Sequence, residues 1–267
     1  MRLKKLFVML LITIFLVSVL LETVSAIPFG ANVGTATTSR KIADTPGSYS
    51  GAYAGNISGF NLNSESITNT WQGYYGNVTG TITLDDASNY TMYNWSLQSP
   101  SGEVYSANQS INWQNIQCFN FTANGTLANN VDNTDAIAGA TSLTGWNMTH
   151  IENMTGIVWN SADGLNETFT YSGAQGHTSF VTDDEQFTTG ECLTTRIYGD
   201  TGAGVQTEFE EALLWDPANY VLVFTSILED NILGFDNAYH DFEMIVLENG
   251  HSGDTQATTY YFWIELE

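Results

Sequence analysis

Basic residues are scarce in this sequence. The 267 residues include six Lys and Arg against 29 Asp and Glu, which gives a formal net charge of −23. A surface of this charge repels nucleic acid and the anionic head groups of membranes, so neither is an expected partner. It favours cations, salt and solubility. A disordered acidic tail would carry similar charge, but 13% aromatic residues with seven Trp indicate a packed core.

Cysteine is rare too, because Cys118 and Cys192 are the only two. In an exported protein such a pair most simply forms a disulfide. Closing a loop of about 75 residues would stabilise the fold by roughly 4 kcal/mol. Two buried free thiols are the alternative. A separation this long does not suit a metal-binding pair or a redox dithiol.

A long apolar run occurs only near the start, at Leu6–Leu21. Three basic residues precede it, and the small residues Val24-Ser25-Ala26 follow it. Residues 1–26 therefore have the pattern of a secretory signal peptide. The run is shorter than the roughly 20 residues that a spanning helix prefers, although an uncleaved anchor is the alternative. We expect an extracellular or cell-surface protein, with no transmembrane segment after signal cleavage.

Asn-X-Ser/Thr glycosylation acceptors are abundant, and all of them fall in one stretch of the chain. They begin at Asn56, Asn77, Asn89, Asn94, Asn108, Asn120, Asn124, Asn147, Asn153 and Asn166. Together with the export signal, they predict N-glycosylation outside the membrane. Strands rich in Asn and Thr also produce some such triplets by chance.

Most acceptors carry an apolar middle residue. These residues are Ile57, Val78, Tyr90, Trp95, Phe121, Met148 and Met154. On a strand, residues i and i+2 share one face and residue i+1 points to the other. We therefore expect the Asn and the hydroxyl to face water while the middle side chain faces the core.

Period-two hydrophobic patterns dominate the chain, with alternation over residues 78–84, 91–97, 242–246 and 260–266. Residues 220–228 are almost wholly apolar, as a strand buried on both faces would be. Clusters of Gly, Asn, Asp and Ser separate the runs. These patterns predict an all-β fold, an antiparallel β-sandwich of Ig-like or jelly-roll-like type with at most one or two short helices. One short helix or a long loop is expected within residues 123–140.

The domain organisation follows from the same patterns. Residues 27–50 are weakly patterned and form an expected exposed lead-in. Residues 51–267 are expected to form a single β-sandwich domain, with an N-glycosylated part at 56–166 and a bare acidic part at 167–267. The bare part either docks another molecule or is simply more buried.

Acidic clusters provide the candidate metal ligands, with calcium as the metal that they would suit. The candidates are Asp183, Asp184, Glu185, Asp236, Asp241 and Glu243. None fits the twelve-residue calcium loop, and solvated turn residues are the alternative. If residues 239–247 form one strand, Asp241 and Glu243 share a face and His240 points to the other. Beyond calcium, no cofactor is expected.

Aromatic residues provide the candidate ligand site. Trp71, Tyr74 and Tyr75 lie close together, and exposed aromatic rings stack on sugars, although core packing is their commoner use. A sugar hydrolase would need two carboxylates flanking the bond. Glu208 with Glu210, or Asp241 with Glu243, would supply such a pair on one strand face. Among so many acids such pairs arise by chance, so we do not expect an enzyme and assign no catalytic residue.

The stretch Thr70–Gly80, TWQGYYGNVTG, resembles segments of uncharacterised, secreted archaeal surface proteins. The run from Phe235 to His251 has a similar character. The resemblance implies an archaeal cell-envelope protein. More loosely, the acidic, acceptor-rich β chain is similar to archaeal S-layer proteins and donor-strand filament subunits. Such a filament subunit receives a strand from its neighbour, and residues 27–50 would be the donor.

Taken together, these features predict a secreted, glycosylated cell-surface protein with a structural or adhesive role. It would form part of an envelope layer or filament, or bind a cell-envelope protein or glycans. The alternative is a carbohydrate-binding module that uses exposed aromatic residues and calcium, and a third option is a carboxylate-dependent glycoside hydrolase.

Overall fold

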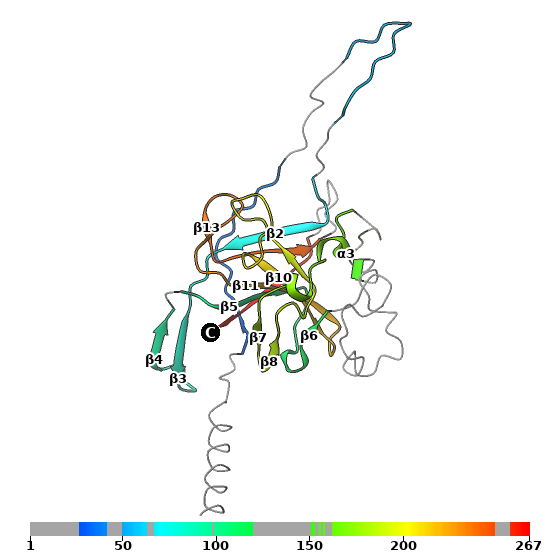
Figure 1. The fold of residues 1–267 in the computed structure, drawn as a ribbon. Helices are drawn as coiled ribbons and strands as arrows, with labels where there is room; N and C mark the ends of the chain where they lie inside the picture. Colours follow the sequence, from blue (N-terminus) through cyan, green and yellow to red (C-terminus); the bar gives the residue numbers. More distant parts are fainter. Residues whose placement is uncertain are drawn as a thin grey trace, which may run out of the picture.

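The computed structural model describes residues 27–41, 50–62, 67–97, 99–119, 151–152, 155, 157, 162–248 and 257–267. Antiparallel strands dominate this part of the chain, which confirms the predicted all-β, sandwich-like fold (Figure 1). The short helical elements of this part include the four-residue helix α3 (Leu165–Thr168) and the 3-10 turns η1 (Trp113–Asn115) and η3 (Gly173–Gln175). The segment 123–140, where one short helix or a long loop was expected, lies outside the described residues.

The largest sheet has seven strands. Its order is β1 (Phe29–Gly30), β15 (Tyr261–Leu266), β5 (Gly102–Ala107), β11 (Val221–Ile227), β10 (Glu210–Asp216) and β6 (Gln117–Cys118), and β9 (Thr194–Arg196) also pairs with β10. Every residue of β11 is buried, as the apolar run at 220–228 predicts. This strand therefore anchors the centre of the fold.

Within the described residues, four two-stranded ribbons accompany the large sheet. They are β2 (Trp71–Gly76) with β14 (Phe242–Leu247), β3 (Thr81–Asp85) with β4 (Thr91–Ser96), β7 (Phe180–Thr182) with β8 (Glu185–Phe187), and β12 (Ile232–Leu233) with β13 (Tyr239–His240). All four pairs are antiparallel.

Hydrophobic cores cover both faces of the large sheet. On one face, Phe224 of β11 belongs to the same cluster as Met244 and Val246 of β14. On the other face, Val223 of β11 clusters with Phe180 and Phe187 of the β7–β8 ribbon. Burying each such side chain contributes roughly 1.5–3 kcal/mol. The body therefore has three layers, with the large sheet between the β2–β14 ribbon and the β7–β8 ribbon.

Strand β15 shows how the alternation in the sequence separates these two cores. The even-numbered residues 260, 262, 264 and 266 pack against the first core, as the pattern predicts. Trp263 packs against the second core, and Glu265 is also buried on that side. The opposite face of this strand is covered because the β7–β8 ribbon lies there.

The disulfide predicted from the sequence is present. It joins Cys118 of β6 to Cys192, which precedes β9, and the Cα atoms lie 4.9 Å apart. The acceptor-rich part of the chain and the bare part are thus linked covalently. They also share sheets, because β2 pairs along its full length with β14.

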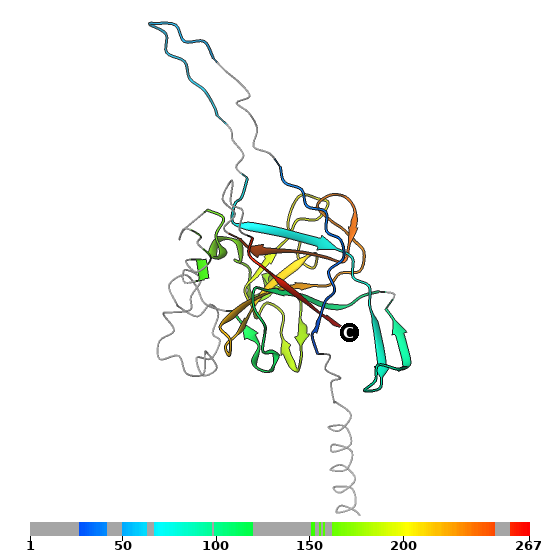
Figure 2. The ribbon, with the colours of Figure 1, turned by 180° about the vertical axis from the view of Figure 1, so that it is seen from behind.

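Two segments extend beyond the layered body. Residues 32–41 and 50–62 are exposed throughout, and residues 50–62 run far out from the sheets (Figure 1). The β3–β4 hairpin stands beside the body on the side opposite α3, in both views (Figure 2). Near the start of the described chain, Phe29 and Gly30 pair with Ile264 and Trp263 of β15. Among the described residues, no helix has the length and apolar character needed to span a membrane.

Candidate functional site

The β2–β14 ribbon positions the first part of the candidate site. Its register places Tyr75 opposite Glu243 and Tyr74 opposite Met244. Because side chains alternate along a strand, Tyr74 turns inward, where its ring lies 5.1 Å from that of Phe262. Tyr75 turns outward and is 50% exposed. The ribbon therefore offers one tyrosine to the core and its neighbour to the surface.

The turn between β12 and β13 covers Glu243. The Phe235 backbone N–H donates to Glu243 Oε1 at 3.1 Å. A Cβ atom on Gly234 would lie 2.2 Å from that oxygen and 2.4 Å from His240 Cδ2, so a side chain at this position would displace Glu243 and His240. Burial raises the pKa of Glu243, and the hydrogen bond from Phe235 opposes the shift. Both effects follow from the close packing of the turn on the ribbon.

His240 and Asp236 form a polar pair at the same turn. His240 Nε2 lies 2.8 Å from Asp236 Oδ1, and the histidine side chain is 8% exposed against 33% for the aspartate. The Ala238 N–H donates to the same Oδ1 at 2.9 Å. This backbone hydrogen bond, followed by the bond from His240, lowers the pKa of Asp236. The carboxylate is therefore ionised at neutral pH and reaches solvent.

Three aromatic rings meet beside this pair. The Tyr75 and Phe235 ring centroids are 5.1 Å apart with an interplanar angle of 77°, and His240 lies 4.7 Å from Tyr75. Phe235 is 52% exposed, like Tyr75. We call Tyr75, Phe235, Asp236, His240 and Glu243 the aromatic–carboxylate cluster. It combines two half-exposed rings with an ionised acceptor, which is chemistry suited to a hydroxylated ligand with an apolar face.

The other aromatic candidates lie elsewhere. Trp71 packs against Phe169 and Phe224, with centroid distances of 6.0 and 6.4 Å, and donates its indole N–H to the Asp163 carbonyl at 2.6 Å. Tyr74 belongs to the same core. Of the three candidates, only Tyr75 is exposed beside other polar and aromatic groups.

The candidate metal ligands separate into two places. Asp183 and Asp184 form the turn of the β7–β8 hairpin and Glu185 begins β8, while Asp236, Asp241 and Glu243 lie around β13 and β14. Within the described ranges, no group of three or more His, Cys, Asp or Glu residues is placed to hold a metal ion. The structure therefore does not bring the six candidate acids together in one place.

Asp241 has a structural position. Its two carboxylate oxygens accept from the Val78 N–H at 2.7 Å and the Asn231 N–H at 3.1 Å. The strand expected over 239–247 breaks at this residue, between β13 and β14. The arrangement with His240 opposite Glu243 required one unbroken strand, which the structure does not form, and both side chains approach Gly234.

The carboxylate pair Glu208 and Glu210 does not share a regular strand face, because β10 begins only at Glu210. Thr207 and Phe209 have φ values of 69° and 43°, which interrupt an extended chain. Both oxygens of Glu210 accept backbone N–H groups, one from Thr178 at 2.7 Å and one from Thr207 at 3.2 Å. Glu210 is thus engaged in holding the local backbone.

The glycosylation acceptors are well displayed where the structure describes them. Asn56, Asn77, Asn89, Asn94 and Asn108 are exposed, and Asn166 is partly buried. The acceptors Asn120, Asn124, Asn147 and Asn153 lie outside the described residues. Accessibility at these positions is what a transferase requires.

Among the apolar middle residues that the structure describes, Val78 alone follows the expected pattern, because it packs against the first core. Ile57, Tyr90 and Trp95 are exposed instead, at 102%, 75% and 63%. The expectation fails for these three because the extended segment and the β3–β4 hairpin stand outside the layered body. Phe121, Met148 and Met154 lie outside the described residues.

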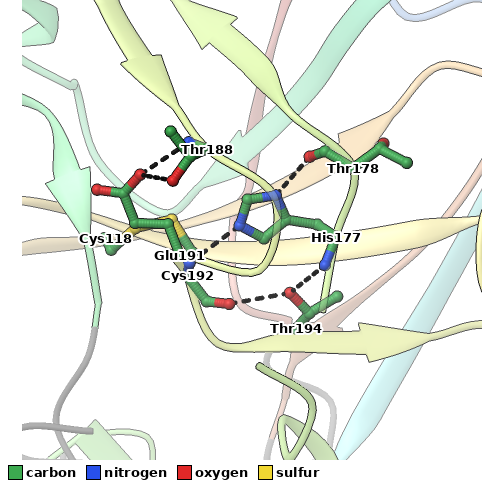
Figure 3. The surroundings of a disulfide bond; sticks show 7 residues. All are labelled: Cys118, His177, Thr178, Thr188, Glu191, Cys192 and Thr194. Carbon is green, nitrogen blue, oxygen red and sulfur yellow. Dashed lines mark hydrogen bonds between the residues drawn. A yellow bond between two sulfur atoms is a disulfide. The ribbon is translucent and has the colours of Figure 1, made fainter. Parts of the chain in front are cut away.

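A buried histidine packs beside the disulfide (Figure 3). His177 Nε2 accepts from the Cys192 N–H at 2.9 Å, and Nδ1 donates to the Thr178 carbonyl at 2.5 Å. Burial lowers the pKa of His177, so its ring is neutral with the proton on Nδ1. Thr194 Oγ1 lies 3.1 Å from the Cys192 carbonyl. The ring is fully used in supporting the backbone next to the bridge.

Sequence reasoning missed two features of the sites. Phe235 stands in a turn with no local pattern to indicate a contact with Tyr75. Glu103, Tyr105 and Glu265 form a buried acidic group, with the Tyr105 hydroxyl 2.8 Å from Glu265 Oε2 and 3.4 Å from Glu103 Oε2. Because Glu103 and Tyr105 are two residues apart, a strand there would place both on one face. Their spacing could therefore have indicated a partly polar face.

No protein-family model matches the chain, and no curated protein or solved structure matches it.

Proposed function

We propose that the chain is an exported, N-glycosylated protein of the cell surface with a structural or adhesive role. It would take part in an envelope layer or filament, or hold a partner protein. The observation that carries the proposal is the β3–β4 hairpin, whose two faces differ in chemistry. We assign no catalytic residue and no cofactor to the chain.

One face of the hairpin is apolar. The register pairs Ile82 with Trp95 and Leu84 with Tyr93, so these four side chains share a face. They are between 48% and 63% exposed. A contiguous exposed apolar face of this kind marks a protein interaction site. It supports a role in which the hairpin lies against another protein surface.

The other face is mainly polar, apart from the exposed Met92, and carries a glycosylation acceptor. Thr83 pairs with Asn94 and Thr81 with Ser96, the hydroxyl residue of the Asn94 acceptor. Asn89, at the tip, has a left-handed φ of 63° and begins a second acceptor. Sugars on this side would keep it in solvent and leave the apolar face for contact. A lone two-stranded ribbon is only marginally stable in water, which also favours a partner.

The remaining support concerns the compartment. The Cys118–Cys192 disulfide fits an oxidising environment outside the cytosol. The exposed acceptors fit exposure to a glycosylation system. The secretory pattern of residues 1–26 and the resemblance to secreted archaeal surface proteins agree with both.

The test is to purify the protein from the organism that makes it, then measure intact mass and examine it by electron microscopy. We expect added sugar mass, a mature start near Ile27 and ordered assemblies or a co-purifying envelope protein. A double variant, Tyr93→Ser with Trp95→Ser, should abolish the assembly or complex. Thr81→Ser with Thr83→Ser, on the polar face, is the matched control and should leave it intact.

Two results would contradict the proposal. An unmodified mass with the leader retained would contradict the proposed export and glycosylation. Unassembled monomers under all salt conditions, with no bound partner, would contradict the structural or adhesive role.

A further inference from the structure

The acceptor Asn77 and the ring of Tyr75 lie on the same side of the chain. Tyr74 and Val78 pack against the first core, while Tyr75 and Asn77 are exposed. A Cβ atom at Gly76 would contact the ring of Phe242 at 3.6 Å. The inward and outward alternation of β2 therefore continues past its end, and residues two apart share a face.

We propose that the N-linked glycan of Asn77 folds back onto the aromatic–carboxylate cluster, where Tyr75 and Phe235 hold its first sugar ring. The inference rests on the proposed glycosylation and names the occupant of the cluster. That occupant is the protein's own glycan, attached two residues from the ring that receives it.

The position of this aromatic residue distinguishes Asn77 from the other acceptors. Of the ten Asn-X-Ser/Thr acceptors, only Asn77 has an aromatic residue two positions before it. The corresponding residue is Met92 for Asn94 and Ser106 for Asn108. Asn77 is therefore the one acceptor whose sugar has an aromatic ring two residues earlier on the same side of the chain.

The two rings form a corner suited to a sugar. Tyr75 and Phe235 are 50% and 52% exposed, and their planes meet at 77° with centroids 5.1 Å apart. The C–H face of a pyranose stacks on one ring while its edge contacts the other. Both rings are held before binding, Tyr75 by the β2–β14 register and Phe235 by its N–H bond to Glu243. Little conformational entropy is then lost when the sugar is held.

Asp236 supplies the polar contact. Its side chain is 33% exposed, and its Oδ1 is bound by His240 Nε2 and the Ala238 N–H. Sugar hydroxyl groups donate to such a carboxylate in charge-assisted hydrogen bonds. The carboxylate of Asp236 would repel an acidic sugar, so the held ring is an uncharged one.

The experiment is a double-mutant cycle on the glycosylated protein. Thr79→Ala removes the acceptor while keeping Asn77, and Tyr75→Ser removes the ring. We expect the wild-type glycoprotein to unfold about 2–4 °C above Thr79→Ala, and this difference to vanish in the Tyr75→Ser background. Ser110→Ala, which removes the Asn108 acceptor, is the control, and its effect should not depend on Tyr75.

Nuclear magnetic resonance gives a second measurement that does not depend on how the variants fold. In the wild-type glycoprotein, C–H protons of the first sugar on Asn77 should shift upfield from the ring current of Tyr75 or Phe235. The corresponding sugar on Asn108 should show no such shift.

The outcomes separate the two ideas. If peptide mass spectrometry finds Asn77 unmodified while other acceptors carry sugar, this inference fails and the proposed glycosylation survives. If Asn77 is modified but there is no coupling and no ring-current shift, the inference alone is overturned. The released glycan can also be added to the Thr79→Ala protein, which lacks the attached one. If the cluster binds this free glycan as strongly as it holds the attached glycan in the wild type, its occupant comes from another molecule and the inference is likewise overturned.

Discussion

Glu103 and Glu265 face each other directly across strands β5 and β15, and both side chains are buried. The Tyr105 hydroxyl lies between them, and the Asp183 N–H donates to Glu265 at 3.2 Å. Burial, with the charges of Glu267 and Glu265, raises the pKa of Glu103 to about 9. Burial raises the pKa of Glu265 to about 7. At neutral pH the protonated Glu103 thus avoids a repulsion that two carboxylates would create.

This arrangement predicts a fold that loses stability as pH rises. In the unfolded chain both groups titrate near pH 4.5, so between that pH and about 9 the folded protein binds more protons. The free energy of unfolding should fall throughout this range. The fall should be steeper between about pH 4.5 and 7, where both groups keep their protons in the folded chain, than between pH 7 and about 9, where Glu103 alone does, and it should level off above pH 9. Denaturant titrations at pH 5, 7 and 9 measure it.

The matched variants for this pH dependence are Glu103→Gln and Glu167→Gln. Glu103→Gln mimics the protonated acid and should flatten the decline above pH 7. Glu167 is exposed, so its replacement should leave the decline unchanged. Equal pH profiles for the Glu103→Gln variant and the wild type would show that the buried pair does not control stability.

The disulfide should carry a large share of the stability. Replacing Cys118 and Cys192 with Ala removes a bridge of sequence separation 74 and should destabilise the protein by roughly 4 kcal/mol. Denaturant unfolding of the variant and of the reduced wild type should agree with each other. A loss below about 1 kcal/mol would mean that the unfolded chain is already compact without the bridge.

Gly190 should tolerate no side chain. Its φ is 72°, and a Cβ atom there would lie 1.7 Å from the Gly173 carbonyl oxygen. We expect Gly190→Ala to destabilise the protein by more than about 3 kcal/mol, because the turn that supports His177 and the disulfide must open.

Gly202 separates backbone strain from this clash. It has a similar φ of 67° but nothing within 4 Å of an added Cβ. Gly202→Ala should cost only about 1 kcal/mol, the strain of the left-handed backbone. Thermal unfolding of both variants compares them, and equal losses would rule out the close contact as the cause.

Glu211 should show the cost of removing one buried hydrogen-bond acceptor, because its Oε2 has a backbone donor while its buried Oε1 has no hydrogen-bond partner among the described residues. It is fully buried, and its Oε2 accepts from the Ile245 N–H at 2.9 Å. Burial raises its pKa, so Glu211→Gln should preserve the contact at little cost. Glu211→Leu leaves that N–H unpaired and should cost about 1–3 kcal/mol more. Unfolding in urea distinguishes them, and indistinguishable variants would contradict the role of the contact.

Local patterns in the sequence were sufficient for much of the β structure. The apolar run around Val223 indicated a strand buried on both faces, and alternation assigned Phe262 and Ile264 to one core. The same alternation could not indicate that Glu265 is buried, because its cover comes from the distant β7–β8 ribbon. Burial of an acid depends on tertiary packing that a local pattern does not contain.

The candidate site was only partly accessible to sequence reasoning. Tyr75 and Glu243 were separate candidates for an aromatic site and a metal site. Their contact arises from the β2–β14 pairing, which joins segments far apart in the chain. Asp241 breaks the strand between His240 and Glu243 because its carboxylate caps two distant N–H groups. Phe235 joins the cluster only through that break and the turn at Gly234.

The place of β15 in the large sheet has a consequence for biosynthesis. This strand lies between β5 and β1, although β1 and β5 are synthesised much earlier than β15. An elongating chain therefore holds two unmatched strands open until residues 261–266 emerge, and closure by such long-range pairing is slow. Nascent molecules stay vulnerable to proteases and to premature association throughout that interval.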